Sequence, residues 1–546
     1  MMLRSPVRGT HVPRLARIAL LLGALACRPG AVGMPEMDAA AIVEGAGAPG
    51  VPADTIDDAF TVQIDRARWI PRARPGPLPG FWDDVALLDV SAAEKAARTV
   101  DERTFVLALR TLMASDPDGA AVAFGALHSR ATDPAVRARA RVGLTMALSW
   151  HSDWQALARI GDDADSTEQA LDPSVVQAGV ERWARALADV PAAQVFVPDA
   201  PVTMPMRRSA FGTPVITVRV NGRPYEFWLD TGASMTLLSA TVAVQAGVGL
   251  ASPDTLALGV VAGHIPARAV LIDSLTIGLM SARGLTAAVV NPDALRLDRV
   301  QRNGLTEMVQ IDGVIGTDLL RHLDLVLDAG DGTITLSRPR RDVRTPRNLF
   351  WVGYPVVKLV TREGRPVLFG LDTGAEGTFV TTSLLRKLPR TLIAAQRMTL
   401  GGLGPEKQRT RWVAREVKLS DGDYAITLRN TPVTLDRRWT FVTFDGVIGS
   451  DVALATRMHL DFANGIFDVR PSAARATLAP HGIGRRGTPA YGALPSVAAR
   501  RWLADGARDR AAHGALMATA TATATATAMA TVTAAATATT TALQPQ

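Results

Sequence analysis

The sequence predicts a multidomain protein in which an N-terminal all-α, repeat-like helical module precedes a mainly-β region of two similar lobes. Two observations support this prediction. First, the segment 221–233 recurs 142 residues later as the segment 363–375. Second, an Ala- and Arg-rich stretch over residues 83–189 favours helices, whereas apolar residues alternate with a period of two after residue 206.

The composition is that of a folded chain with room for several domains. Its 546 residues are 47% hydrophobic, whereas disordered chains are poor in apolar residues. The net charge of +7 comes from arginines scattered along the chain without a basic block, so we expect no nucleic-acid partner. The one cysteine, Cys27, excludes an intramolecular disulfide framework and a cysteine-based zinc site. We expect no cofactor and no bound metal.

Residues 1–27 have the pattern of an export signal. Four arginines precede the apolar run 18–26, which is too short to span a bilayer as a permanent anchor. The tetrapeptide Ala24-Leu25-Ala26-Cys27 resembles a bacterial lipobox, in which Cys27 would carry the lipid and tether the protein to a membrane. The alternative is an unmodified thiol in an ordinary cleaved signal. We therefore expect an exported protein, either periplasmic or anchored on the extracytoplasmic side of a membrane.

The helical module is expected over residues 83–189. The pairs Asp116-Pro117, Asp133-Pro134 and Asp172-Pro173 are each typical of a helix N-cap followed by proline in the first turn. Short capped helices favour either a repeat array similar to tetratricopeptide repeats or a single helical bundle, and the sequence does not decide between them.

Two flanking regions have little capacity to form a core. Residues 28–82 are rich in Gly, Pro and Ala without a sustained period, and we expect a poorly ordered linker there. Residues 476–546 end in a stretch of nearly pure Ala and Thr, which predicts a disordered tail.

The duplicated region divides into a first lobe at 206–345 and a second at 346–475. In the first lobe, an alternating strand over 215–220 is followed by the turn Asn221-Gly222 and a second strand that ends at Leu229. The second lobe repeats this pattern, and a short helix is expected after Ser239 and after Thr381. Many short strands with glycine turns predict two small, barrel-like lobes.

Each lobe carries one Asp-Thr-Gly sequence, which begins at Asp230 and at Asp372. A single copy is typical of an ordinary turn after a strand. Two copies in equivalent positions would meet if the lobes pair about a pseudo-twofold axis. The two carboxylates would then share one proton, so that the ionised one could deprotonate a water molecule while the other donates to a carbonyl oxygen.

The neighbouring residues fit this arrangement. The hydroxyls of Thr231 and Thr373 could bond across the lobe interface, and Gly232 and Gly374 would let the backbone approach closely. A second repeated motif, 312–318 and 445–451, would place two apolar residues and a glycine beneath each loop. An ordinary buried strand that ends in a turn would give the same pattern.

These motifs resemble the retropepsin-type aspartic peptidases, and two lobes in one chain resemble the bilobal, pepsin-like arrangement. The resemblance covers residues 206–475. It implies an acid-protease fold with Asp230 and Asp372 as the catalytic pair and with Thr231, Gly232, Thr373 and Gly374 in support. It further implies a peptide or protein substrate and a monomer that forms an intramolecular pseudo-dimer.

The resemblance also implies residues that contact the substrate. Glycine-rich flaps would cover it, and they contain Gly259 in the first lobe and Gly401 and Gly402 in the second. Neither flap carries the tyrosine of the pepsin type. The residues after each Asp-Thr-Gly would line the substrate floor: Ala233, Ala375 and Glu376. For Glu376, a solvated or ion-paired acid near Arg386 or Arg411 is the alternative.

Two other functions stay open at this point. The same lobes could form a non-catalytic peptide-binding or scaffold protein, although a binder has no need of a like-charged pair. Alternatively, the helical module could be the functional part. His264 has no partner at a ligand-like spacing and Ser234 has no nearby base in the sequence, so we assign neither a catalytic role.

Overall fold

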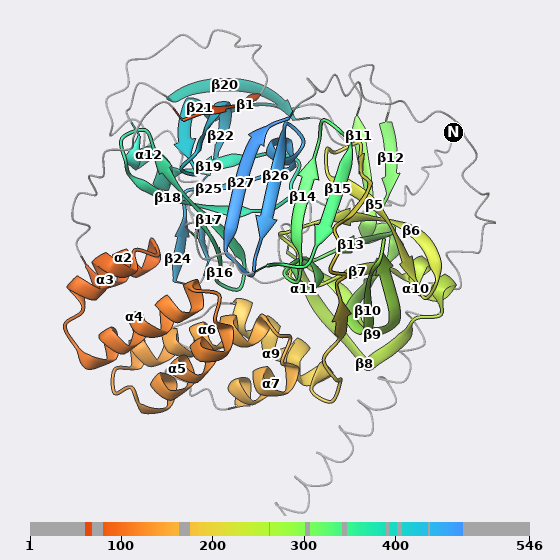
Figure 1. Cartoon of the computed structure of the whole chain (residues 1–546), viewed down its shortest axis with the longest axis horizontal. Helices are drawn as coiled ribbons and strands as arrows, with labels where there is room; N and C mark the ends of the chain where they lie inside the picture. The colour runs from red at the N-terminus through yellow and green to blue at the C-terminus, as the bar shows by residue number, and fades with distance from the viewer. Residues whose placement is uncertain are drawn as a thin grey trace, which may run out of the picture.

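The structure is a computed structural model, and it confirms a helical module followed by two β lobes (Figure 1). The expected export signal with Cys27 and the expected tail at 476–546 lie outside the described residues, and they stay predictions. In the described part of the chain, no helix is both long and apolar enough to cross a membrane. The structure describes residues 61–67, 80–162, 175–260, 263–300, 306–340, 347–388, 393–400, 407–434, 437–439 and 441–472.

The helical module forms because its helices begin at capped positions and bury one face. Asp116 and Asp133 cap their helices as expected, by accepting hydrogen bonds from Gly119 and Ala135. Asp172 lies outside the described residues. The described helices are α2 (Phe81–Ala86), α3 (Val90–Ala96), α4 (Val100–Met113), α5 (Pro117–Arg130), α6 (Pro134–Ser149), α7 (Trp154–Asp162) and α9 (Val175–Leu187).

The first lobe is built on a nine-stranded sheet with the order β2-β10-β7-β13-β6-β5-β9-β8, in which β4 also pairs with β5. Ser239 caps the short helix α10 (Ala240–Ala246), as expected. The strands are β2 (Gln194–Phe196), β4 (Arg207–Arg208), β5 (Pro214–Val220), β6 (Arg223–Leu229), β7 (Leu237–Ser239), β8 (Gly249–Val260), β9 (Gly263–Ile277), β10 (Met280–Val290) and β13 (Gly313–Ile315).

The second lobe repeats this order as β1-β22-β19-β25-β18-β17-β21-β20, with β16 paired to β17. Thr381 precedes the helix α12 (Thr382–Lys387), as expected. The strands are β1 (Thr61–Arg66), β16 (Leu349–Trp351), β17 (Pro355–Thr361), β18 (Pro366–Leu371), β19 (Phe379–Thr381), β20 (Ile393–Leu400), β21 (Lys407–Ser420), β22 (Tyr424–Thr434) and β25 (Gly446–Ile448).

A five-stranded sheet joins the two lobes at the centre of the molecule (Figure 1). Its central pair is antiparallel, one strand from each lobe, and His459 lies 2.7 Å from the Asp324 carboxylate across it. The lobes are therefore related by a local pseudo-twofold axis, as the duplication predicted. The strand order is β27 (Ile466–Pro471), β26 (Thr456–Asp461), β14 (Asp324–Asp328), β15 (Thr333–Ser337) and β3 (Val202–Pro205).

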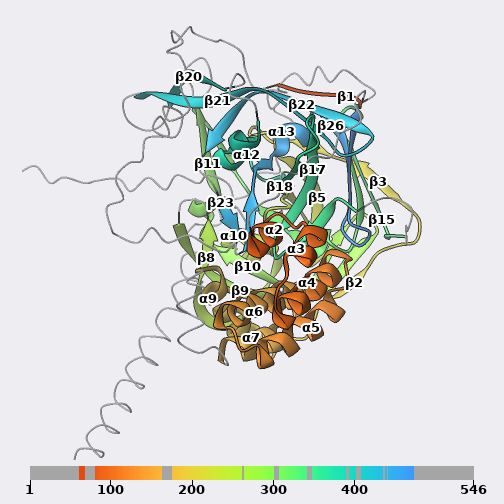
Figure 2. The ribbon, with the colours of Figure 1, turned by 90° about the vertical axis from the view of Figure 1, so that its left-hand side faces the viewer.

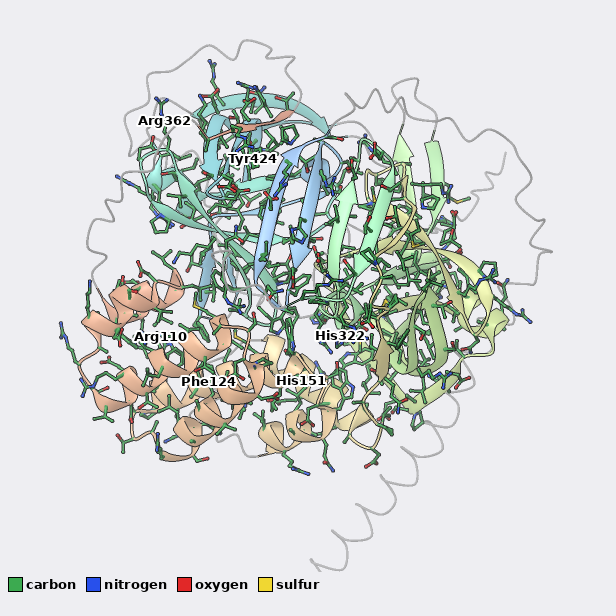
Figure 3. The ribbon with its side chains drawn as sticks, viewed as in Figure 1. Arg110, Phe124, His151, His322, Arg362 and Tyr424 are labelled. Carbon is green, nitrogen blue, oxygen red and sulfur yellow. The ribbon has the colours of Figure 1, made fainter. Side chains whose placement is uncertain are left out.

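The helical module packs against both lobes (Figure 2). On the side of the second lobe, the ring of Phe105 lies 5.6 Å from that of Phe441, and the Trp351 indole donates to a carbonyl of α6. On the side of the first lobe, the Trp183 indole donates to the Ala257 carbonyl of β8 at 3.1 Å. Figure 3 shows Phe124 among the helices, where it contacts Phe105.

A charged junction also joins the module to the first lobe. Arg321 donates to the carbonyl of Ser149 at the end of α6 and to the Ser152 hydroxyl. His322 lies next to it, and Figure 3 shows this histidine near His151 at the same boundary. Burial, followed by the charges of Arg321 and His151, lowers the pKa of His322 to about 4, so this histidine is neutral at pH 7.

The segment expected to be a linker at 28–82 differs from that expectation at residues 61–66. These residues form β1, which pairs with β22 at the edge of the second lobe. The reason is a short alternating run in which Ile64 is buried while its neighbours Gln63 and Asp65 are exposed. Strand β2 occupies the equivalent edge of the first lobe, so two separate N-terminal segments complete the two sheets.

We predict that the helices and the second lobe unfold as one unit. Replacement Phe105→Ala should lower the free energy of unfolding by about 3–5 kcal/mol, because the fully buried ring contacts both α5 and the second lobe. Urea unfolding followed by far-UV circular dichroism and by tryptophan fluorescence checks this. The exposed Leu107 on the same helix gives the control Leu107→Ala, which should change stability little. If the helical circular dichroism signal were lost at a lower urea concentration than the tryptophan fluorescence signal, the prediction would be contradicted.

Candidate active site

Both Asp-Thr-Gly loops follow a buried strand that ends at the lobe interface. Strand β6 ends at Leu229, and β13 runs parallel beside it. The Asp230 amide donates to the carbonyl of Ile315 in β13 at 3.0 Å. In the second lobe, β18 and β25 repeat this pairing, and the Asp372 amide donates to Ile448 at 2.9 Å. The repeated apolar motif therefore supports each loop, as the sequence predicted.

Each loop fixes one oxygen of its own aspartate. The amides of Gly232 and Ala233 donate to Oδ1 of Asp230 at 2.8 and 3.1 Å. The second loop repeats this at Oδ1 of Asp372, with distances of 3.0 and 2.9 Å. These amides leave Oδ2 of each carboxyl group for other partners. Both aspartates are almost completely buried, with exposed fractions of 1% and 0%.

The two carboxyl groups lie against the opposite loops. A methyl group added at Gly232 would lie within 2.8 Å of the Asp372 carboxyl atoms, and one added at Gly374 would overlap the Asp230 carboxyl group. Only glycine therefore fits at these two positions. The structure thus brings the two predicted catalytic residues together across the lobe interface.

Four hydrogen bonds between Thr231 and Thr373 and the opposite loops hold the interface. Each threonine amide donates to the hydroxyl of the other threonine at 3.0 Å. The Thr231 hydroxyl donates to the Leu371 carbonyl at 2.9 Å, and the Thr373 hydroxyl donates to the Leu229 carbonyl at 2.8 Å. Both hydroxyls therefore donate and accept across the interface, and they hold the loops in register.

Burial raises the pKa of both aspartates. At Asp230, burial and then repulsion from Asp372 raise the pKa well above that of an ordinary carboxyl group. Burial raises the pKa of Asp372 to about 6, while hydrogen bonds from Asp230 and from the loop amides favour its ionised form. Two buried carboxyl groups in this position share a proton and titrate as a coupled pair.

A second pair of aspartates fixes the chain after each loop, and we did not predict this role. Asp318 in α11 (Thr317–Leu320) accepts from the amide and the hydroxyl of Thr236 at 2.8 and 3.0 Å. Asp451 in α13 (Ser450–Ala453) accepts equivalently from Thr378 at 2.7 and 2.6 Å. Burial raises the pKa of each of these aspartates to about 6. Asp318 and Asp451 are the last residues of the repeated motif at 312–318 and 445–451, so the sequence already marked these two positions.

The other sequence-predicted residues lie around this centre. Ala233 is buried, and its carbonyl accepts from the amide and hydroxyl of Thr317. Ala375 is half-buried, and Glu376 is exposed while its carbonyl accepts from the Ser450 hydroxyl. Gly259 lies in β8 opposite His264 of β9, within the expected first flap. The expected flap residues Gly401 and Gly402 lie outside the described residues, as does the side chain of Arg411.

We predict that the interlobe threonines contribute strongly to stability. The change Thr231→Val keeps the shape but removes a hydroxyl that serves Thr373 and Leu371, which should cost about 2–4 kcal/mol of unfolding free energy. Denaturant unfolding measures this. The control Thr231→Ser retains the hydroxyl and should lose much less. Equal losses in the two variants would show that packing, rather than the hydrogen bonds, holds the interface.

Comparison with known proteins finds a family model that is similar to part of each lobe. Among solved structures, a retropepsin-like aspartic protease from Rickettsia conorii is 20% identical over 26% of this chain and 92% of that chain; its TM-score of 0.19 adds nothing to the fold described above. No curated protein matches the sequence. The family model for aspartyl protease matches twice, at residues 216–319 and 358–452, and each match contains one Asp-Thr-Gly loop. Each lobe therefore contains one segment that is similar to the aspartyl protease family model.

Proposed function

We propose that the protein is an aspartic-type endopeptidase that hydrolyses peptide bonds with water activated between Asp230 and Asp372. One observation carries this proposal: the two carboxyl groups meet across the interface, each against the glycine of the opposite loop. Their raised pKa values support a pair with one shared proton. Paired carboxyl groups with split roles are suited to acid–base chemistry on a carbonyl group.

The proposed reaction needs one ionised and one protonated aspartate. The ionised carboxylate takes a proton from water as its oxygen attacks the carbonyl carbon of the substrate. The protonated carboxyl group donates to the carbonyl oxygen, and a tetrahedral diol forms. Collapse of the diol breaks the carbon–nitrogen bond, and a proton passes to the leaving amine. The four threonine hydrogen bonds and the loop amides hold both carboxyl groups in place, which limits reorganisation during these steps.

We further propose that the substrate is an extended peptide. Such a peptide can add as a strand beside the β8–β9 hairpin, where Gly259 lies near the tip. In this proposal Ala233, Ala375 and the exposed Glu376 lie along its path. The lobes differ here, because Ser234 of the first lobe corresponds to Glu376 of the second. The carboxylate of Glu376 favours a substrate that carries a basic residue or a free amine at the end bound by the second lobe.

Replacement of either catalytic aspartate should abolish cleavage. Asp230→Asn and Asp372→Asn keep the shape but remove the shared proton chemistry, so kcat/KM on a fluorogenic peptide library should fall by roughly 10³-fold or more. The exposed turn residue Asp331 gives the control Asp331→Asn, which should leave the rate unchanged. A folded variant with full activity would contradict the proposal. Peptide binding by the wild type without turnover would favour the non-catalytic binding function instead.

The pH profile should reflect the raised pKa values. As the pH rises through about 6, the first proton leaves the pair and the singly protonated, active form appears. A further rise removes the proton held at Asp230, so kcat/KM against pH should be bell-shaped. We therefore expect the acidic limb near pH 6. An acidic limb near pH 4, the ordinary carboxyl range, would show that burial does not shift the pair.

A further inference from the structure

Helix α9 of the helical module lies against the β8–β9 hairpin of the first lobe (Figure 2). The indole of Trp183, which is 6% exposed, donates to the Ala257 carbonyl of β8 at 3.1 Å. The residue opposite Ala257 in β9 is Pro266, which has no N–H to donate. The helix therefore supplies a hydrogen bond that β9 cannot supply at this point, to a strand that ends the strand order of its sheet.

The same face of α9 packs on the hairpin through apolar side chains. Trp183 and Leu187 are four residues apart, so they lie on one face of the helix. Both belong to one apolar cluster with Leu256 and Leu258 of β8. This cluster also contains Ala233, which directly follows the Asp-Thr-Gly sequence of the first lobe. One apolar cluster thus extends from the helical module through the hairpin to the first Asp-Thr-Gly loop.

The other faces of α9 are fixed to the rest of the helical module. Arg141 in α6 donates to the Glu181 carboxylate at 3.2 Å, and the two side chains are only 3% and 14% exposed. Val180 and Ala184 belong to a separate apolar cluster with Leu157 of α7. Separation of a buried ion pair is strongly unfavourable because it leaves a buried charge without its partner. Helix α9 is therefore a firm support for the hairpin that packs against it.

We propose that Trp183 is a positioning residue that holds the β8–β9 hairpin where it contacts the substrate. This inference rests on the proposed peptidase function and on the proposed path of the peptide beside that hairpin. Gly259 lies two residues beyond Ala257, so the hydrogen bond from the indole fixes β8 directly next to this path. The helical module then takes part in substrate binding by the first lobe, which a separate adaptor module would not do.

A hairpin without this support should spend less time in the position that binds the peptide. The affinity of a protein for its ligand falls in proportion to the fraction of molecules in the binding-competent conformation. The loss of one ordinary hydrogen bond changes such an equilibrium by up to about tenfold. The hairpin would contact the peptide equally before and during the reaction, so the change should appear in KM rather than in kcat.

The change Trp183→Phe tests this role because it keeps an aromatic ring and removes the indole N–H. The KM for a fluorogenic peptide should rise by roughly threefold to tenfold, while kcat stays within about twofold. The matched control is Trp351→Phe. The Trp351 indole is 7% exposed and donates to the Met146 carbonyl of the module, also at 3.1 Å, but it lies in β16 of the second lobe. An unchanged KM in Trp183→Phe, or an equal rise in Trp351→Phe, would overturn the proposal.

A readout that needs no turnover separates this proposal from the peptidase function. In hydrogen–deuterium exchange of the peptide-free protein, the amides of β8 and β9 should exchange faster in Trp183→Phe than in the wild type or in Trp351→Phe. Unchanged exchange in Trp183→Phe would overturn the positioning role of Trp183 even if peptides are cleaved. Faster exchange in a chain that cleaves no peptide would contradict the peptidase proposal alone.

Discussion

The repulsion between two buried carboxyl groups is the constraint on which the rest of the site depends. Burial raises the pKa of both Asp230 and Asp372, and repulsion from Asp372 raises that of Asp230 further, which favours a pair that holds one proton over a pair that is fully ionised. Such an arrangement costs stability, and it persists only where the surrounding structure enforces it. Glycine at two positions permits the approach, and the reciprocal threonine hydrogen bonds prevent the loops from separating.

The remaining architecture holds the two loops together. The central antiparallel pair β14–β26 fixes one lobe on the other, while Asp318 and Asp451 fix the chain after each loop. The helical module contacts both lobes, through Trp183 on one side and Phe105 on the other. A single chain of two lobes need not be symmetric. The residue two positions before the aspartate, for example, is Trp228 in the first lobe and Gly370 in the second.

The close approach of the two Asp-Thr-Gly loops could be predicted from sequence because the signal is local and occurs twice. Equivalent positions that lie at the interface between two copies meet at the axis that relates them, so the approach of Asp230 to Asp372 and the threonine contacts between the lobes were expected without coordinates. The roles of Asp318 and Asp451 were not predicted, because their hydrogen bonds with Thr236 and Thr378 join segments that are 82 and 73 residues apart in the sequence. Strand β1 was also missed, because six residues in a Gly- and Pro-rich region form a strand only through pairing with distant β22.

The shared proton is tested most directly by a double-mutant cycle on stability with Asp230→Asn, Asp372→Asn and the double variant. A raised carboxyl pKa means that the folded state binds the proton more tightly, so stability falls as the pH rises from about 4 through the raised pKa. At pH 7 each single replacement should relieve the same repulsion, so the double variant should gain little further unfolding free energy. We expect a coupling of roughly 0.5–3 kcal/mol at pH 7 that largely disappears at pH 3, where both groups are neutral. Additive effects at pH 7 would show that the two carboxyl groups do not interact.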